Sequence, residues 1–230
     1  MEMEERIYTI PVNEAFESDD GCPFCRLYKK LEDDELDLIL GASMMEPDIR
    51  IKTNKLGFCG KHNNRMFNMK NRLGMGLMLE SHLAEIRKSV ETKPSIFTKD
   101  AGASTAKALD ELSCSCYVCE MVSGKLSKMI ETAVILWERD RDFRTKTQNQ
   151  KFFCLPHYSA FLKVASNKMS KKLYPEFLKA VNETQMAYFD KLSADVSWFC
   201  KKFDYRYDSE PWGDSKDAVE RSIAFLNGCE

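Results

Sequence analysis

This sequence lacks the features that mark membrane and secreted proteins. Among its 230 residues, no apolar run approaches the roughly 18 residues that a membrane-spanning helix needs. The opening stretch, MEMEERIYTIPVNEAFESDDG, is acidic and has no apolar centre, which predicts that it is not a secretory signal. We therefore expect a cytoplasmic protein, in which thiols stay reduced.

Recognisable catalytic and phosphate-binding motifs are also missing. The patterns GxSxG, HExxH and Walker A do not occur, and the GMG at residues 74–76 lacks the context of a phosphate-binding loop. Strand-like alternation is almost absent, and RIYTIPV at residues 6–12 is the one stretch that could be extended. The net charge of −2 argues against a chain that binds polyanions over its whole surface. No enzymatic class is therefore indicated.

Cysteine, by contrast, is plentiful. The nine cysteines form an odd set, which a fully paired disulfide framework does not explain. Two CxxC motifs, CPFC at residues 22–25 and CYVC at residues 116–119, are each followed by a CxxH motif. These are CGKH at residues 59–62 and CLPH at residues 154–157. The four motifs indicate metal-binding or redox chemistry.

The motifs belong to an internal repeat. A shift of 94 residues places Cys22 on Cys116 and Cys25 on Cys119, and places DIRIKT at residues 48–53 on DFRTKT at residues 142–147. One inserted residue then aligns CGKH with CLPH. We interpret the chain as two copies of a module of roughly 70 residues, joined by residues 92–104.

Each module reads as helical. Apolar residues recur at helical spacing after each motif, as with Leu27, Leu31, Leu38 and Ile39 after CPFC. Pro175 suits the start of a long helix over residues 175–202, and a last short helix would be capped by Asp214 or Ser215 and end at Gly228. We predict an all-α fold with a first module in residues 1–91, a second in 105–172 and a C-terminal helical extension in 173–230.

CPFC alone resembles the active-site motif of glutaredoxin-like redox proteins, but that fold needs a buried strand before the motif. The preceding residues, NEAFESDDG, are acidic and polar. A tetrahedral zinc site explains both motif types, because CxxC aims two sulfurs at one ion and CxxH at a helix start adds a thiolate and an imidazole. We predict about two structural zinc ions per chain. Their ligands would be Cys22, Cys25, Cys59 and His62 for one, and Cys116, Cys119, Cys154 and His157 for the other.

Several alternatives stay open at this point. The modules could exchange ligands, the metal could be an iron–sulfur cluster, or the cysteines could be metal-free buried thiols. Cys114 could be an alternative ligand, whereas Cys200 and Cys229 read as ordinary thiols and His82 as a helix histidine outside the sites.

Each half of the sequence also contains one stretch that is basic and has no acidic residue. Residues 49–79 and 143–175 each contain seven Lys or Arg and no acid, whereas residues 32–37 read EDDELD. The basic stretches could hold the phosphates of a nucleic acid, with Lys52, Lys55, Lys146 and Lys151 displayed on loops. The alternative, which we favour because the net charge is slightly negative, is that acidic and basic halves pack against each other or are solvated.

The stretches YTIPVNEAFE, CPFCRL and GFCGKH, with the ending FCKKFDYR…PWGDSKDA…RSI…LNG, are similar to a bacterial family with a domain of unknown function. Its members carry a CPxCR…GFCxxH pattern and a similar tail. The resemblance implies a bacterial cytoplasmic protein and supports Cys22, Cys25, Cys59 and His62 as a unit. It implies no activity.

Three functions fit these observations. The first is a non-enzymatic binding or regulatory protein with structural zinc, whose partner is a protein or a nucleic acid. The second is a thiol-based redox sensor or oxidoreductase in which oxidisable cysteines hold the zinc. The third is an enzyme whose site lies between the modules and leaves no motif.

Overall fold

The computed structural model describes residues 2–91 and 100–228, and within them every regular element is a helix. The predicted all-α class is therefore confirmed. The first half contains α1 (Glu2–Glu17), α2 (Pro23–Leu40), α3 (Pro47–Leu56), α4 (Gly60–Asn68) and α5 (Arg72–Val90). After residues 92–99 come α6 (Ala101–Ser113), α7 (Tyr117–Arg139), α8 (Arg141–Gln148), α9 (Leu155–Lys168) and α10 (Tyr174–Lys201). Two short 3-10 turns, η1 (Tyr205–Tyr207) and η2 (Gly213–Ser215), precede α11 (Ala218–Asn227).

The helices form two compact units that interleave the two halves of the chain. The first unit takes Met1–Lys29 and Lys125–Glu230, and the second takes Lys30–Gly124. Helices α2 and α7 each contribute residues to both units. Each unit therefore contains one CxxC motif and one CxxH motif, drawn from opposite halves of the sequence.

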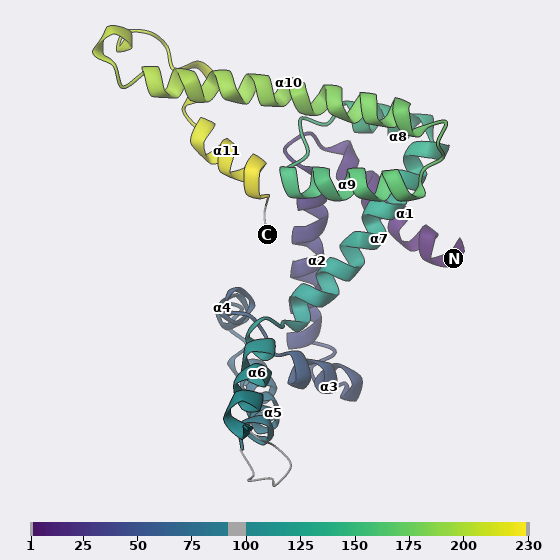
Figure 1. Cartoon of the computed structure of the whole chain (residues 1–230), viewed down its shortest axis with the longest axis vertical. Helices are drawn as coiled ribbons and strands as arrows, with labels where there is room; N and C mark the ends of the chain where they lie inside the picture. Colours follow the sequence, from purple (N-terminus) through teal and green to yellow (C-terminus); the bar gives the residue numbers. More distant parts are fainter. Residues whose placement is uncertain (1, 92–99, 229–230) are drawn as a thin grey trace. The chain divides into compact units, whose positions relative to one another are not determined.

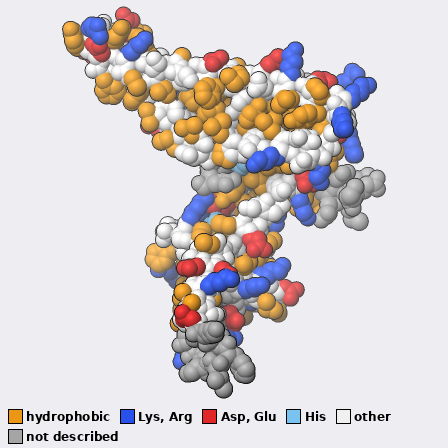
Figure 2. Space-filling model, viewed as in Figure 1, with side chains coloured by type: hydrophobic (Ala, Val, Ile, Leu, Met, Phe, Trp, Pro, Cys, Tyr) orange, Lys and Arg blue, Asp and Glu red, His pale blue; other side chains and the backbone are white. Residues whose placement is uncertain are grey.

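The first unit is built on an aromatic core. Helix α10 packs against α8, α9 and α11, as Figure 1 shows, and α1 packs against α8. Many of the rings meet edge to face, at centroid distances such as 4.9 Å between Phe161 and Phe177 and 5.0 Å between Phe24 and Phe161. Phe24 is the third residue of the CPFC motif and is completely buried, so the core anchors the motif directly. Hydrophobic side chains also gather on the exposed surface over α10 (Figure 2), where Phe189 and Met186 are about half exposed.

The second unit is smaller. Helix α5 packs against α3, α4 and α6. Met66 and Met78 are buried in this unit, and Gly57, with φ of 60°, lets the chain turn from α3 toward the CGKH motif. A Cβ at Gly57 would lie 2.5 Å from Nε2 of His82, so only glycine fits beneath that ring. His82 itself bonds through Nδ1 to the carbonyl of Asn54 at 2.8 Å. The structure thus places His82 outside the cysteine sites, as expected.

Three local predictions were wrong. RIYTIPV is not extended but lies in α1, because Val12, Ala15 and Phe16 bury one helical face despite the proline at position 11. The last helix begins after Asp217, not at Asp214 or Ser215, although it ends at Gly228 as predicted. The expected linker is partly helical, since α6 starts at Ala101, while residues 92–99 lie outside the described part of the chain.

Candidate metal centres

All four motifs place their first cysteine at the same position relative to a helix. Cys59 and Cys154 are the N-cap residues of α4 and α9, and both have extended backbone angles. Cys22 and Cys116 directly precede α2 and α7. The fourth residue of each motif then lies in the first helical turn, and an N-cap side chain faces the third helical residue. The expectation that each CxxH motif begins a helix, with its cysteine just before the first turn and its histidine within it, is therefore confirmed.

The eight motif residues meet in two clusters. Cluster 1 lies in the first unit and consists of Cys22, Cys25, Cys154 and His157. Cluster 2 lies in the second unit and consists of Cys59, His62, Cys116 and Cys119. In each, one donor atom from every residue lies within 4.8 Å of the others. All eight predicted residues are brought together, but the predicted grouping was wrong, because each CxxC joins the CxxH of the other half of the sequence.

Helix geometry explains the exchange of ligands. Helix α2 begins directly after Cys22 and runs without a break from Pro23 to Leu40, a helix about 27 Å long at 1.5 Å per residue. The chain then enters α3 and reaches CGKH inside the second unit, beside α2 residue Glu32. Cys22 is therefore left to pair with a motif that returns later in the sequence, which is CLPH at α9. The spacing of the motifs along the sequence does not indicate the direction in which α2 runs, so it does not indicate which CxxH motif meets Cys22.

The donor distances in cluster 1 match a tetrahedral site. Nδ1 of His157 lies 3.1 Å from Sγ of Cys154, 3.5 Å from Cys25 and 3.8 Å from Cys22, and the Cys25 and Cys154 sulfurs are 3.6 Å apart. Zinc bonds of about 2.3 Å to sulfur and 2.0–2.1 Å to nitrogen imply tetrahedron edges of about 3.6–3.8 Å. Three of the four separations are close to these edges, and the one between His157 and Cys154 is shorter. The sulfurs are too far apart for a disulfide, whose S–S length is about 2.05 Å.

Cluster 2 has the same geometry. Nδ1 of His62 lies 3.2 Å from the sulfurs of both Cys59 and Cys116 and 3.5 Å from that of Cys119. The Cys59 and Cys119 sulfurs are 3.9 Å apart. Three sulfurs and one imidazole nitrogen form a donor set that suits zinc or another thiophilic metal, and four protein ligands leave no open coordination position.

The local electrostatics favour thiolates. Cluster 1 lies at the N-termini of α2 and α9 and cluster 2 at those of α4 and α7, where helix dipoles stabilise negative charge. Burial raises the pKa of Cys22, but hydrogen bonds from Cys154, Cys25 and His157 outweigh it and hold that pKa well below the usual range. Cys119 is the exception, because burial and then the neighbouring Cys116 and Cys59 raise its pKa to about 12, an effect that a bound cation would oppose.

Cluster 2 has an outer support that the sequence analysis missed. Nε2 of His62 lies 2.8 Å from Oε1 of Glu32, which is 4% exposed, and Lys61 pairs with the same carboxylate oxygen at 3.0 Å. Arg65 pairs with Glu32 and Asp33. A carboxylate behind a ligating imidazole fixes its orientation and raises its basicity. A signal did exist, because Tyr28, Glu32 and Ile39 recur at helical spacing and all three are buried.

Cluster 1 is supported by the side-chain amide of Gln185, where cluster 2 has a carboxylate. The backbone N–H of Phe153 donates to Oε1 of Gln185 at 3.1 Å, and Nε2 of Gln185 donates to the carbonyl of Phe153 at 2.9 Å. Phe153 directly precedes the ligand Cys154, so this pair of bonds fixes the entry of the chain into the cluster. Gly228 closes the other side, since a Cβ there would lie 3.0 Å from Sγ of Cys154.

The remaining cysteines lie outside both clusters. Cys114 is exposed at the end of α6 and Cys200 is exposed on α10. Cys114 is not among the four donors of cluster 2. Cys229 lies outside the described residues.

Of the four lysines that we expected on loops, Lys151 alone lies in a coil. Lys52 and Lys55 lie on α3 and Lys146 lies on α8. Several basic side chains pair with acids of their own unit, among them Lys61 and Arg65 with Glu32, and Lys146 with Glu17 at 3.0 Å. Arg26, which directly follows Cys25, donates to Asp20 and to the carbonyls of Ala15, Ser18 and Gly21. No helix in the described part of the chain combines the length and apolar character that crossing a bilayer requires.

Fold and clusters together define an all-helical protein with two candidate metal sites made of cysteine and histidine. The chain belongs to a family of unknown function (DUF6062), whose sequence profile matches residues 3–230. No curated protein and no solved structure matches the chain.

Proposed function

We propose that this protein is a non-enzymatic binding or regulatory protein whose helical units are each held together by one structural zinc ion. The observation that carries the proposal is the convergence of three sulfurs and one Nδ1 in each cluster, at separations that fit the edges of a zinc tetrahedron. The ligands of cluster 1 are Cys22, Cys25, Cys154 and His157, and those of cluster 2 are Cys59, His62, Cys116 and Cys119.

The proposed ions would stabilise long-range contacts. In cluster 1 the ligands Cys25 and Cys154 are 129 positions apart, and in cluster 2 Cys59 and Cys119 are 60 apart. A metal that joins such distant segments contributes its binding free energy to folding, because the unfolded chain has no preformed site. We further infer that the two sequence halves are copies of one helical module whose CxxC and CxxH motifs are exchanged. This reading explains why one set of motifs recurs at equivalent helix starts.

Elemental analysis of protein purified under reducing conditions without added metal tests the proposal. We expect about two zinc ions per chain, and removal by a strong chelator should lower helicity and the midpoint of thermal unfolding. Folded, reduced protein that contains no metal would overturn the proposal. Iron and sulfide in place of zinc would replace the ions with iron–sulfur clusters.

A thiol-based redox role is the second candidate, because Cys25 of cluster 1 is only half-buried and lines an open pocket. An oxidant that reached this sulfur would convert thiolates to a disulfide and release the ion. Counts of reactive thiols with and without chelator separate the two roles. A regulatory disulfide requires zinc release at low peroxide concentrations, whereas a purely structural site retains its ion under the same treatment.

A further inference from the structure

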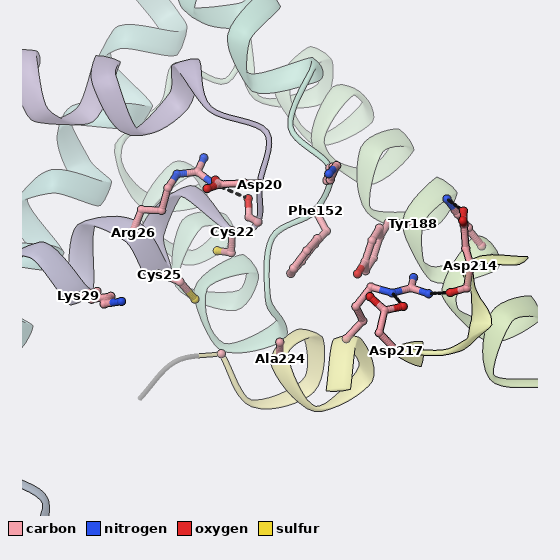
Figure 3. Close-up of a pocket in the computed structure, with 15 residues that line it drawn as sticks. Asp20, Cys22, Cys25, Arg26, Lys29, Phe152, Tyr188, Asp214, Asp217 and Ala224 are labelled. Carbon is pink, nitrogen blue, oxygen red and sulfur yellow. Dashed lines mark hydrogen bonds and ion pairs between the residues drawn. The ribbon is translucent and has the colours of Figure 1, made fainter. Parts of the chain in front are cut away.

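A pocket of about 570 Å³ lies in the first unit beside cluster 1. It is formed by the turn before α2, the first turns of α2, the coil at residues 151–152, helices α10 and α11, and η2, as Figure 3 shows. Its volume falls within the range of about 300–1,000 Å³ that is typical of small-molecule sites. Cys22 and Cys25 of cluster 1 form part of its wall, but a structural metal site does not need a cavity of this size.

One wall of the pocket is aromatic and rigid. The rings of Phe152 and Tyr188 are stacked with centroids 4.3 Å apart and planes at 20°. Figure 3 shows both rings reaching into the pocket, one from the coil before α9 and one from α10. Phe225 packs behind them, 5.7 Å from Phe152 and 5.4 Å from Tyr188. A flat apolar group can lie against such a wall without ordering any side chain first.

The acids of the pocket are already paired. Asp20 pairs with Arg26 at 2.5 Å, Asp214 with Lys191 at 2.9 Å and Asp217 with Arg221 at 2.9 Å, which leaves none of the three lining carboxylates without a cation. Two further lining residues, Lys29 and Lys151, are exposed and form no ion pair with any side chain in residues 7–91 or 102–228. The pocket therefore presents two uncommitted positive charges.

Cluster 1 does not cancel this surplus. Three thiolates, a neutral imidazole and the proposed divalent ion would together have a net charge of −1, and Cys22 and Cys25 line the pocket. The lining contains five cationic side chains and three carboxylates, so one positive charge remains even when the cluster is counted. A ligand that enters here meets a net positive charge and an aromatic wall.

We propose that this pocket binds a small organic anion. The planar, apolar body of the ligand lies against Phe152 and Tyr188, and its carboxylate or phosphate group pairs with Lys29 and Lys151. This inference goes beyond the metal sites and stands on the cavity, the stacked rings and the two lysines.

Matched naphthalene probes test the proposal on the full, metal-loaded chain. Isothermal titration calorimetry with naphthoate, naphthyl phosphate and the neutral naphthalenemethanol separates the charge of the ligand from its apolar body. We expect both anions to bind about tenfold more tightly than the alcohol, since each of two exposed charge pairs adds a modest attraction. The stronger of the two anions identifies the preferred head group.

Two sets of variants locate the binding. The double change Lys29→Gln with Lys151→Gln should weaken the anions to the affinity of the alcohol and leave the alcohol unchanged. Tyr188→Ala should weaken all three probes by about fivefold, because it removes half of the aromatic wall. The control is Lys171→Gln with Lys172→Gln, which makes the same charge change on exposed residues of the same unit outside the pocket and should alter nothing.

Three results would overturn the proposal: no binding of any probe at millimolar concentration, equal affinity for anions and alcohol, or unchanged anion affinity in the Lys29 and Lys151 variant. Zinc content and thermal unfolding are measured on every variant. If the lysines serve only to balance cluster 1, their loss lowers zinc content without a change in anion binding. A failure to bind with two zinc ions in place leaves the proposed function standing.

Discussion

Nε2 of His62 lies 2.8 Å from Oε1 of Glu32, with Nδ1 of the same ring directed at the sulfurs of Cys59 and Cys116. The ring thus connects a buried carboxylate to the candidate metal site. Nε2 contacts the carboxylate, and Nδ1 faces the sulfurs of the site. Lys61 and Arg65 pair with the same carboxylate, which balances its charge. These pairs, with burial acting against them, lower the pKa of Glu32 and keep it ionised near neutral pH.

Glu32→Gln should therefore weaken metal binding at cluster 2 without removing a ligand. The amide still fills the space but no longer supplies the negative charge behind the imidazole, and we expect a loss of about 10–100-fold in zinc affinity. Competition with a zinc-binding dye measures this, and the ion in cluster 1 serves as an internal reference. Asp34→Asn is the matched control, because it makes the same change on an exposed residue of the same helix. Equal affinities in the two variants would contradict the role of Glu32.

Gln185→Leu should destabilise the protein through the backbone of Phe153. The change leaves a buried N–H and a buried carbonyl without their side-chain partner, and each such group costs about 1–3 kcal/mol. We expect a loss of about 2–4 kcal/mol in the free energy of unfolding, measured by urea denaturation with zinc present. Gln148→Leu, on an exposed position of α8, should change stability by less than about 0.5 kcal/mol. A similar small effect at Gln185 would show that water replaces the amide.

Two glycines should respond to alanine in opposite directions. Gly228 has φ of 72°, and a Cβ there would lie 3.0 Å from Sγ of Cys154, so Gly228→Ala should cost about 1–2 kcal/mol and speed the release of one zinc ion to a chelator. Gly124 lies inside α7 with nothing within 4 Å of its Cβ position. Gly124→Ala should therefore stabilise the protein by about 1 kcal/mol. Thermal unfolding of the two variants measures both changes in stability. Changes of the same sign in the two variants would contradict this prediction.

The positions that the sequence predicted well are those set by local geometry. Cys59 and His62, like Cys154 and His157, follow from the fixed relation between an N-cap and the first turn of its helix. The partner of each motif was not predictable from spacing, because the direction of α2 and α7 decides it. Glu32 was hidden in a run of acids that reads as a solvated face, although its helical register with Tyr28 and Ile39 indicates burial. The pocket is lined by residues as far apart in the sequence as Lys29 and Gly228, so no local sequence pattern predicts it.

Reversal of the four lysines Lys52, Lys55, Lys146 and Lys151 to glutamate tests whether the basic stretches bind nucleic acid. We expect no binding of mixed DNA or RNA by the parent protein near physiological salt, because basic side chains such as Lys146 and Arg65 already pair with acids. The single change Lys146→Glu should lower stability by up to about 1 kcal/mol through its contact with Glu17, while Lys52→Glu should not. Anisotropy titrations at two salt concentrations are the measurement. Micromolar binding that weakens with salt and disappears in the fourfold variant would establish a nucleic-acid surface.

The exchange of ligands between the two halves of the chain makes a prediction that distinguishes it from sequential pairing, in which each CxxC motif would share a metal with the CxxH motif that follows it. Cys22→Ser with Cys154→Ser removes two ligands from cluster 1 alone, so this variant should retain one zinc ion per chain. Cys22→Ser with Cys59→Ser removes one ligand from each cluster, so both sites should lose affinity and little zinc should remain under chelator. Sequential pairing predicts the reverse for both variants.

Zinc per chain is counted after gel filtration in a chelator of fixed strength, and circular dichroism verifies that each variant is helical. Cys200→Ser, an exposed cysteine outside both clusters, should retain two ions and the stability of the parent. If both double variants kept the same amount of zinc, the two clusters would not act as separate sites.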